Sequence, residues 1–503
     1  MLARVATFAI EGVDSREVTV EVDIRPGLPV FTVVGLPDAA VREARERVRA
    51  AILNSGFEFP QQRLTANLAP AHVRKAGPRF DLALAVALLA ASGQLPSDAV
   101  DSCAVCGELS LGGELRPVHG AVAVAAGAKA AGFTRLIVPF ENASEAALVE
   151  GINVLGAPNL ESLGDLLTGR WTPPPPTPAP ARSRKSVPIP DLADVRGQGD
   201  ARRALEIAAA GGHNLLMIGP PGVGKTMLAR RLPGILPPPS FAESLEITRV
   251  HSVAGLSNGN LVDERPFRAP HHTISSSGLV GGGPTPRPGE ITLAHRGVLF
   301  LDEFPEFSRY AIEALRQPLE EGYVKVSRGQ RTLTFPAATM LVAACNNCPC
   351  GRSVIDCHCT AADLLRYRRR LSAPLVDRID LVCHLDASPH LSHAGEPPES
   401  TASVRARVLA ARELQRRRFE GLEVLSNAGM DARLTAAHVK LGGAARRRLR
   451  LGVEQAALSA RGHDRVLRLA RTIADLEGSA RVQTAHVEEA LGYKMTSPLA
   501  VAA

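Results

Sequence analysis

Residues 219–226, Gly-Pro-Pro-Gly-Val-Gly-Lys-Thr, constrain the fold of this chain more than any other segment. An apolar run at 215–218 precedes them and indicates a buried strand, and residues 227–232 follow with a sequence typical of a helix. A phosphate-binding loop requires this context, and its glycines let successive N–H groups point into one concavity at a helix N-terminus. The flanking elements disfavour the alternative, a glycine-rich turn with a solvated lysine. The sequence therefore predicts a site for a nucleoside triphosphate.

Two side chains of this loop and two later acids are predicted to carry the chemistry. Lys225 is expected to contact the outer phosphates, and the hydroxyl of Thr226 is expected to bind Mg²⁺. An apolar strand at 297–301 leads into Asp302 and Glu303, at the end of a parallel strand where ligands bind in α/β sheets. We expect Asp302 to hold Mg²⁺ through water and Glu303 to polarise the attacking water. The other predicted nucleotide contacts are the loop residues Gly219, Pro220, Pro221, Gly222, Val223 and Gly224.

Composition places limits on the class of protein. At 503 residues the chain is too long for one core, so two or three domains are expected. No apolar run reaches the roughly 18 residues of a membrane helix, and no signal-peptide pattern is present, which predicts a cytoplasmic protein without a membrane partner. The net charge of +7 is compatible with a polyanionic partner without requiring one. Aromatic residues make up only 4% of the chain, so nucleic-acid contacts are expected to go mainly to phosphates.

Four stretches follow one another along the chain. Residues 1–171 alternate short strand and helix patterns and predict an α+β domain, and 172–190 form a linker whose proline-rich half is expected to be extended and to span up to about 30 Å. Residues 191–388 contain the phosphate loop and predict a nucleotide-binding α/β core with a parallel sheet. Residues 389–503 are predicted to be helical and strongly basic in places. No internal repeat is evident.

The first stretch resembles the proteolytic domain of Lon-type proteases. The resemblance lies in the order of Lys-Ala-Gly-Pro at 75–78, an apolar helix, a hairpin at 106–117 and an alanine-rich helix at 121–131. Where that family has its nucleophilic serine and its lysine base, this chain has Arg79 and Val122. A serine–lysine mechanism needs both groups, so the resemblance implies a protease-like fold without protease activity.

Two features resemble the AAA+ class of ATPases. An apolar strand at 341–345 ends in Asn346, which matches the class's first sensor, a residue that orients the lytic water. Residues 372–380 resemble the segment whose arginine reaches the γ-phosphate of the neighbouring subunit, which makes Arg378 the candidate arginine finger. The alternative for Arg378 is a surface ion pair with Asp377 or Asp380.

A third AAA+ feature lies in the last stretch, which the resemblance makes a helical lid. Residues 459–461 resemble the start of the lid helix that carries the second sensor. Arg461 is the candidate sensor and Arg465 is the alternative.

Two inserts narrow the family. Residues 267–295 and a hairpin at 319–335 resemble the helix-two insert and pre-sensor hairpin of the magnesium-chelatase-like AAA+ branch. With the Lon-like first domain, the order of motifs resembles that of the YifB/ComM family. The resemblance implies an ATP- and Mg²⁺-dependent ATPase, a homo-oligomeric ring of six subunits, and DNA branch migration as a helicase during recombination or natural transformation. The alternatives are an ATPase that remodels protein, as chelatase motor subunits do, and an ATP-dependent protease, which Arg79 and Val122 oppose.

Basic residues of the hairpin are the candidate DNA contacts. Lys325, Arg328 and Arg331 are predicted to meet DNA phosphates in the pore, although a solvated turn has the same composition. Adjacent residues rarely share one metal ion, so His271 and His272 are interpreted as polar contacts of a loop, with a DNA-facing role as the other option.

Five of the eight cysteines lie between Cys345 and Cys359, which in a cytosolic chain indicates metal before disulfide. Four thiolates suit tetrahedral Zn²⁺, although the one-residue gaps are tighter than usual. The alternative is a reduced loop without metal, and Cys345 and His358 are spare ligand candidates. The predicted zinc ligands are Cys348, Cys350, Cys357 and Cys359. The separate Cys103 and Cys106 are interpreted as buried thiols.

Overall fold

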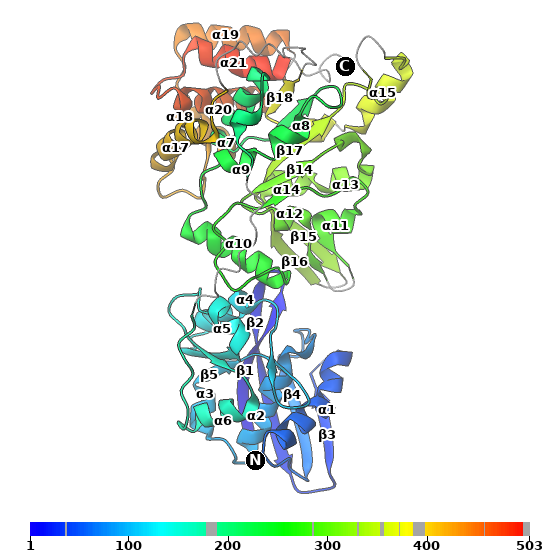
Figure 1. Cartoon of the computed structure of the whole chain (residues 1–503), viewed down its shortest axis with the longest axis vertical. Helices are drawn as coiled ribbons and strands as arrows, with labels where there is room; N and C mark the ends of the chain where they lie inside the picture. Colours follow the sequence, from blue (N-terminus) through cyan, green and yellow to red (C-terminus); the bar gives the residue numbers. More distant parts are fainter. Residues whose placement is uncertain are drawn as a thin grey trace. The chain divides into compact units, whose positions relative to one another are not determined.

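The computed structural model describes residues 1–35, 38–177, 189–283, 286–328, 331–352, 357–371, 373–385, 398–456 and 458–495 (Figure 1). The chain divides into two compact units. The first unit consists of Met1–Arg184, Phe241–Val262 and Ser327–Thr334, and the second unit consists of Lys185–Ser240, Asp263–Val326 and Phe335–Ala503. The units are described separately below.

A mixed seven-stranded sheet, in the order β3-β4-β2-β1-β5-β8-β9, forms the centre of the first unit. Its longest strands are antiparallel and pair from Leu2↔Asp23 to Glu11↔Asp14, whereas β5, β8 and β9 run parallel. Alternate residues of β2 are buried, as the sequence pattern predicted. The strands are β1 (Leu2–Glu11), β2 (Asp14–Arg25), β3 (Val30–Val34), β4 (Arg63–Ala69), β5 (Cys103–Val105), β8 (Arg135–Pro139) and β9 (Asn153–Ala157).

Helices cover both faces of this sheet. Alternate residues of β5 enter different cores, Cys103 and Val105 in one and Ala104 in the other, because successive strand residues point to opposite faces. Helix α2 is apolar on every side and is wholly buried, and its Asp81 bonds Arg47 at 2.8 Å. The elements are α1 (Ala39–Asn54), η1 (Pro78–Phe80), α2 (Asp81–Ala91), α3 (Ser97–Asp101), β6 (Glu108–Leu109), β7 (Leu115–Arg116), α4 (Ala121–Ala130), α5 (Phe140–Ala146) and α6 (Leu160–Leu167).

The first unit also contains helix α10 (Phe241–Val253), which the sequence-based boundaries grouped with residues 191–388. Arg249 pairs with Asp14 at 3.0 Å, and the carbonyl of Ser252 accepts a hydrogen bond from the N–H of Gly120 at 3.1 Å. Leu245 packs against the core that α4 and α5 share. A segment that follows the phosphate loop in sequence is therefore folded into the N-terminal body.

The second unit is built on a five-stranded parallel sheet in the order β11-β14-β17-β10-β18. The three central strands β14, β17 and β10 are buried along their whole length, which explains why the sequence shows continuous apolar runs there. The predicted α/β class with a parallel sheet is confirmed. The strands are β10 (Leu215–Ile218), β11 (Phe267–Arg268), β14 (Val298–Leu301), β17 (Met340–Cys345) and β18 (Leu381–His384).

The helix predicted at 227–232 is wrong in its bounds. Helix α8 (Lys225–Ala229) stops early and α9 (Leu232–Ile235) starts anew, because the ring of Pro233 is incompatible with a carbonyl four residues before it in a continuous helix. The other elements around the sheet are η2 (Leu192–Asp194), α7 (Gly199–Gly211), α11 (Ser276–Val280), β12 (Gly281–Gly282), β13 (Arg287–Pro288), α12 (Glu290–Leu293), η3 (Phe304–Glu306), α13 (Arg309–Ala314), α14 (Arg316–Glu321), β15 (Tyr323–Arg328), β16 (Arg331–Pro336), α15 (Ala361–Arg370) and α16 (Ala373–Val376).

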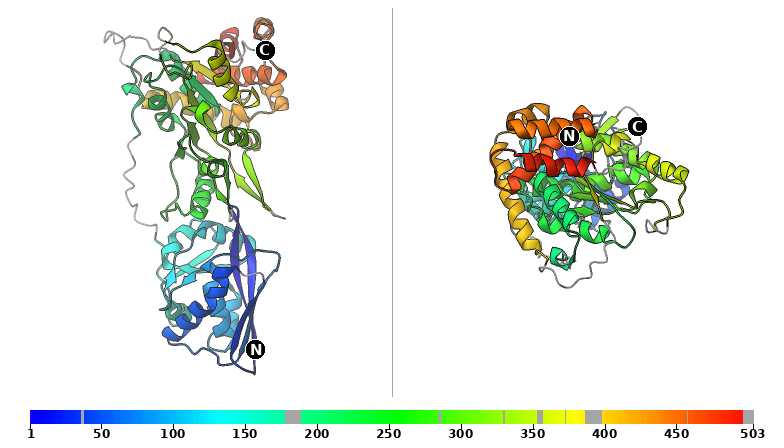
Figure 2. Two further views of the ribbon diagram at one scale, coloured as in Figure 1. Left: turned by 90° about the vertical axis from the view of Figure 1, so that its right-hand side faces the viewer. Right: turned by 90° about the horizontal axis from the view of Figure 1, so that it is seen from above.

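The C-terminal stretch is helical, as predicted, and its helices lie together as one group (orange to red in Figure 2). Its charges are partly internal: Asp475 accepts from Arg418 at 2.6 Å and from Arg471 at 2.9 Å. The elements are α17 (Thr401–Arg418), η4 (Asn427–Gly429), α18 (Ala432–His438), α19 (Gly443–Gln455), α20 (Ala460–Leu476) and α21 (Thr484–Met495). None of the helices in the described ranges has the length and apolar character that a membrane crossing demands.

Candidate active site

The phosphate loop, residues 219–226, connects β10 to α8 in the second unit. Gly222 and Gly224 have φ angles of 78° and 99°, in the left-handed region that favours glycine. At Gly219 a Cβ atom would lie 2.6 Å from the carbonyl oxygen of Leu385, so no side chain fits there. The three glycines of the sequence pattern are thus required by backbone geometry, two for conformation and one for close packing.

Lys225 lies across this loop and is almost fully buried. Its Nζ donates to the carbonyl oxygens of Gly219 at 2.7 Å and Pro220 at 2.9 Å, and to Oδ1 of Asn346 at 3.0 Å. Burial lowers the pKa of Lys225, and the negative charge of nearby groups, Asp302 among them, opposes that shift. The fold therefore brings together two residues that the sequence predicted separately, the loop lysine and the candidate first sensor.

Thr226 and Asp302 also meet, across 76 positions of sequence. The hydroxyl of Thr226 donates to Oδ2 of Asp302 at 2.5 Å, and Oδ1 of Asp302 accepts from the N–H of Glu303 at 3.0 Å. Both acids follow β14, which lies between β11 and β17 in the sheet. A hydroxyl and a carboxylate are hard oxygen donors, so this pair fits a Mg²⁺ ion that is shared with phosphates.

Glu303 has a partner that the sequence analysis missed. Its Oε2 lies 3.1 Å from Nδ1 of His272, whereas His271 bonds the hydroxyl of Thr273 at 2.9 Å. The backbone of Glu303 is left-handed, with φ of 49°, a strained conformation for a residue with a side chain. Both histidines make polar contacts from a loop, as interpreted, but the contact of His272 is with a predicted catalytic residue. His272 follows β11, and only the order of strands shows that β11 adjoins the strand that ends at the two acids.

The two candidate arginines lie together. Arg378, between α16 and β18, pairs with Oε2 of Glu320, and Nη2 of Arg461, in the first turn of α20, lies 3.7 Å from Oε1 of the same carboxylate. The side chain of Arg378 is 11% exposed and that of Arg461 is 66% exposed. A single acid that the sequence analysis did not single out therefore joins the predicted finger and the predicted sensor.

The alternative sensor, Arg465, belongs to a different network. It lies 3.4 Å from Oδ1 of the buried Asp380, whose Oδ2 lies 3.4 Å from Nδ1 of His213. Burial opposes ionisation of Asp380, but its hydrogen bond to His213 and the neighbouring positive charges lower its pKa. Arg465 thus neutralises an internal carboxylate, and the geometry favours Arg461 as the arginine able to meet a ligand.

The four predicted zinc ligands form one cluster in the second unit. The sulfur atoms of Cys348, Cys350, Cys357 and Cys359 all lie within 4.8 Å of one another. Cys348 lies 3.2 Å from Cys350 and 3.6 Å from Cys357, close to the roughly 3.8 Å between sulfurs around tetrahedral zinc. Hydrogen bonding to the backbone of Arg352 lowers the pKa of Cys350 to about 6, toward the thiolate that binds metal. The donor set fits zinc.

The two spare ligand candidates are not part of this cluster. Cys345 is buried at the end of β17, where desolvation raises the pKa of its thiol to about 12. Cys103 and Cys106 in the first unit are buried thiols, as interpreted from the sequence.

The hairpin β15/β16 carries the candidate DNA contacts. Lys325 is exposed and its Nζ lies 5.0 Å from the centre of the Tyr323 ring. Arg328 and Arg331 occupy the ends of the two strands, but their side chains lie outside the described part of the structure. The assignment of these residues to DNA stays a prediction.

Neither of the two predicted protease positions offers a reactive group. Val122 lies in α4 and its side chain is buried in the core, and Arg79 lies in η1, where its carbonyl accepts from the N–H of Gly107 at 3.1 Å. The absence of protease activity remains a prediction from these residues.

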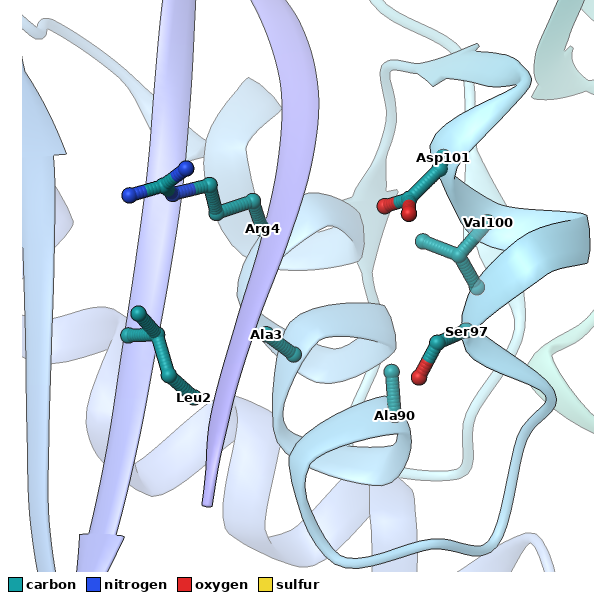
Figure 3. A pocket seen from close by; sticks show the side chains of 7 residues that line it. All are labelled: Leu2, Ala3, Arg4, Ala90, Ser97, Val100 and Asp101. Carbon is teal, nitrogen blue, oxygen red and sulfur yellow. The ribbon is translucent and has the colours of Figure 1, made fainter.

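A shallow pocket at the start of β1 also lies in the first unit (Figure 3). Its volume is about 210 Å³, and its lining includes Arg4 and Asp101. Arg4 points away from Asp101 and pairs with Glu21 at 3.1 Å. The charged side chains do not converge, so this pocket is not a catalytic candidate.

Comparison with known families agrees with this arrangement. The model for magnesium chelatase, subunit ChlI, matches residues 191–392, the model for subunit ChlI of Mg-chelatase matches 20–142, and its C-terminal model matches 398–494. These matches include the phosphate loop, both candidate arginines and the cysteine cluster.

Several proteins are similar over nearly their whole length. The YifB protein of Escherichia coli strain K12 is 45% identical over 507 residues, which cover 99% of this chain and 98% of that protein. The competence protein ComM of Haemophilus influenzae is 43% identical over 501 residues, 98% of this chain and 97% of that protein. A further protein is similar over a short part only: Lon protease 2 of Bacillus subtilis is 30% identical over 148 residues, which cover 25% of this chain and 25% of that protein.

Proposed function

Because this chain belongs to the YifB/ComM family of magnesium-chelatase-like AAA+ ATPases, we propose that it hydrolyses ATP to drive branch migration of DNA as a helicase. The observation that carries the ATPase half is the contact of Thr226 in the phosphate loop with Asp302, the first of the two acids that follow β14. The name of the Haemophilus relative, a competence protein, supports a setting in recombination or natural transformation. The proposal places the protein in the cytoplasm, where chromosomal DNA and ATP are found.

Five side chains in and around the phosphate loop have roles in this proposal. Lys225 exchanges its carbonyl contacts for phosphate oxygens, and Asn346, at 3.0 Å from its Nζ, stands where it can orient a water molecule. Glu303 accepts the proton of the attacking water. Thr226 and Asp302 hold Mg²⁺, which supplies charge neutralisation for the phosphates.

Arg378 and Arg461 complete the site from an adjoining copy. A head-to-tail interface repeated around a closed ring gives each protomer one phosphate loop and one pair of arginines for its neighbour, and we propose a hexamer. An arginine finger is worth about 10³ to 10⁵ in turnover. The C-terminal helices, which carry Arg461, act as a lid that moves when ATP is hydrolysed.

ATP turnover in the presence of different DNAs tests the second half of the proposal. Four-way and duplex DNA are expected to raise the rate of phosphate release over that without DNA, in a salt-dependent manner. Replacing Lys325, Arg328 and Arg331 by alanine is expected to weaken DNA binding and reduce its salt dependence, since each phosphate contact adds about one to the salt slope, while basal turnover persists. ATP turnover that no DNA changes would contradict the DNA motor.

One observation favours a second candidate function, an ATPase that remodels another protein. Three chelatase models match the first domain, the core and the C-terminal helices, so the likeness is not confined to the nucleotide site. Stimulation of ATP turnover by a protein partner in the absence of DNA would identify this function.

We further propose that the cysteine cluster binds one structural Zn²⁺. Support comes from the four sulfurs within 4.8 Å and from the soft donor set that tetrahedral zinc prefers. The ion would fix the chain between β17 and α15 and would take no part in hydrolysis.

A further inference from the structure

Glu320 is the only residue that the described contacts join to both candidate arginines. It lies near the end of α14, 58 positions before Arg378, and α20, which carries Arg461, follows still later in the chain. Its Oε2 accepts from Arg378 and its Oε1 lies 3.7 Å from Nη2 of Arg461. Three segments that are remote in sequence thus meet at one carboxylate.

The carboxylate can hold both guanidinium groups at once. Each arginine approaches a different oxygen of Glu320, Arg378 in a hydrogen bond and Arg461 in an ion pair, so the two guanidinium groups do not compete for one acceptor. Two guanidinium groups that approach one phosphate repel each other, and a carboxylate between them offsets that repulsion. The bond to Arg378 lowers the pKa of Glu320, so this carboxylate is charged at neutral pH.

Two of the three side chains are also accessible to an adjoining molecule. The side chains of Glu320 and Arg461 are 50% and 66% exposed, whereas the side chain of Arg378 is 11% exposed. An arginine finger must be held firmly and yet lie near the surface of its own protomer. Arg378 is held firmly because its side chain is covered. It also lies near the surface, because its partner Glu320 is half exposed.

The next residue provides an internal comparison. Glu321 is also acidic and exposed, but it accepts from Nε2 of Gln317 at 2.7 Å, one turn back on the same helix. Its contacts are local, whereas those of Glu320 join separate segments. Glu321 is therefore a matched control for the charge and location of Glu320.

We propose that Glu320 is a positioning residue, which holds Arg378 and Arg461 of one protomer as a pair and presents them to the nucleotide of the adjoining protomer. This inference rests on the proposed site shared between protomers. It makes Glu320 part of the arginine half of that site, although Glu320 itself touches no nucleotide.

Steady-state ATP hydrolysis by the full-length protein tests the assignment. Glu320→Ala is expected to lower kcat about 10- to 100-fold, since a small misplacement of a catalytic group has effects of that size, while KM for ATP changes less than about twofold. Glu320→Gln offers one acceptor oxygen for two arginines and is expected to fall between the parent and Glu320→Ala. Glu321→Ala is expected to match the parent. An unchanged kcat in both Glu320 variants, or a loss that appears in KM, would overturn the proposal.

Mixed assemblies separate this proposal from the shared site on which it rests. Arg378→Ala protomers mixed with Lys225→Ala protomers are expected to regain activity, because about a quarter of the interfaces then combine an intact loop with an intact arginine. Glu320→Ala protomers are expected to behave like Arg378→Ala protomers, so they regain activity with Lys225→Ala and not with Arg378→Ala.

The two failures look different. If the control mixture of Arg378→Ala and Lys225→Ala stays inactive, the shared site is wrong. If that control regains activity but Glu320→Ala is rescued by Arg378→Ala instead of by Lys225→Ala, Glu320 serves the loop half and the positioning role is wrong. Glu320→Gln repeats the mixture with little change in side-chain volume, so the result stands even if the alanine variant folds poorly.

Discussion

Glu303 combines a strained backbone with a side chain that ends against an imidazole. A left-handed φ costs a residue such as glutamate about 1–3 kcal/mol, and the fold tolerates this cost where the carboxylate follows β14. This backbone conformation sets the direction in which the side chain leaves the chain, and the contact with Nδ1 of His272 at 3.1 Å holds the carboxylate in place. At the scale of single residues, the imidazole is therefore as much a part of the site as the acids that the sequence predicted.

The contact makes a specific prediction for His272. His272→Ala is expected to lower ATP turnover about tenfold at unchanged KM, because Glu303 then loses the group that orients it toward water. His272→Asn is expected to recover part of that loss, since its amide nitrogen stands near the place of Nδ1. Phosphate-release kinetics with His271→Ala as the control measure the effect, because His271 bonds Thr273 instead. Equal losses in the two alanine variants would show that the loop matters only for folding.

Single residues were predictable where a short pattern fixes them. The eight-residue loop, the two acids and Asn346 follow buried strands, and apolar runs reveal such strands without knowledge of the fold. Glu320 and His272 were not predictable, because each acts on a residue remote in sequence through strand order and helix placement. No local pattern carries that information.

At the scale of elements, central strands were predicted best and short elements worst. Strands β10, β14 and β17 are buried on both faces, so their sequences are apolar throughout. The break between α8 and α9 was missed because the helical pattern continues across it, although Pro233 indicates that a helix begins anew there. The place of α10 was missed because its contacts are with a body that ends more than 50 positions earlier in the chain.

The cysteine cluster is an element whose stability depends on a metal. The parent protein is expected to contain about one zinc per chain, and Cys350→Ser is expected to lose it, because three thiolates bind zinc far more weakly than four. Elemental analysis of the purified protein measures both. Cys345→Ala is the matched control and is expected to keep its zinc, since the buried Cys345 is outside the cluster. A parent protein without metal would show that the thiols form a reduced loop only.

At the scale of the whole molecule, the order of the chain and the division of the fold do not coincide. The main body of the first unit ends at Arg184, but the unit also takes in Phe241–Val262 and Ser327–Thr334. The proline-rich linker is thus one of five places where the chain passes between units. The predicted boundaries at 171 and 191 mark a change in composition. Composition does not reveal that two later segments of the chain also belong to the first unit.

This division predicts the outcome of cutting the linker. Insertion of a protease site after Arg182 and cleavage are expected to leave the two fragments associated, because α10 stays packed on the N-terminal body through contacts such as Arg249–Asp14. Size-exclusion chromatography of the cleaved protein under native conditions measures the association. The double variant Phe241→Ala and Leu245→Ala, with less apolar surface on α10, is the comparison and is expected to dissociate more readily. Separation of the fragments of the parent chain would contradict the packing.

The packing of α10 bears on how this protein can be divided for experiments. An isolated fragment of residues 1–171 lacks α10, which covers part of α4. The apolar surface near Gly120 is then exposed to water, and such a surface promotes aggregation. A self-sufficient version of that body needs α10 grafted onto it through a designed connection. Conversely, an ATPase fragment from which the residues before 191 are removed keeps α10 but lacks the N-terminal body on which that helix packs.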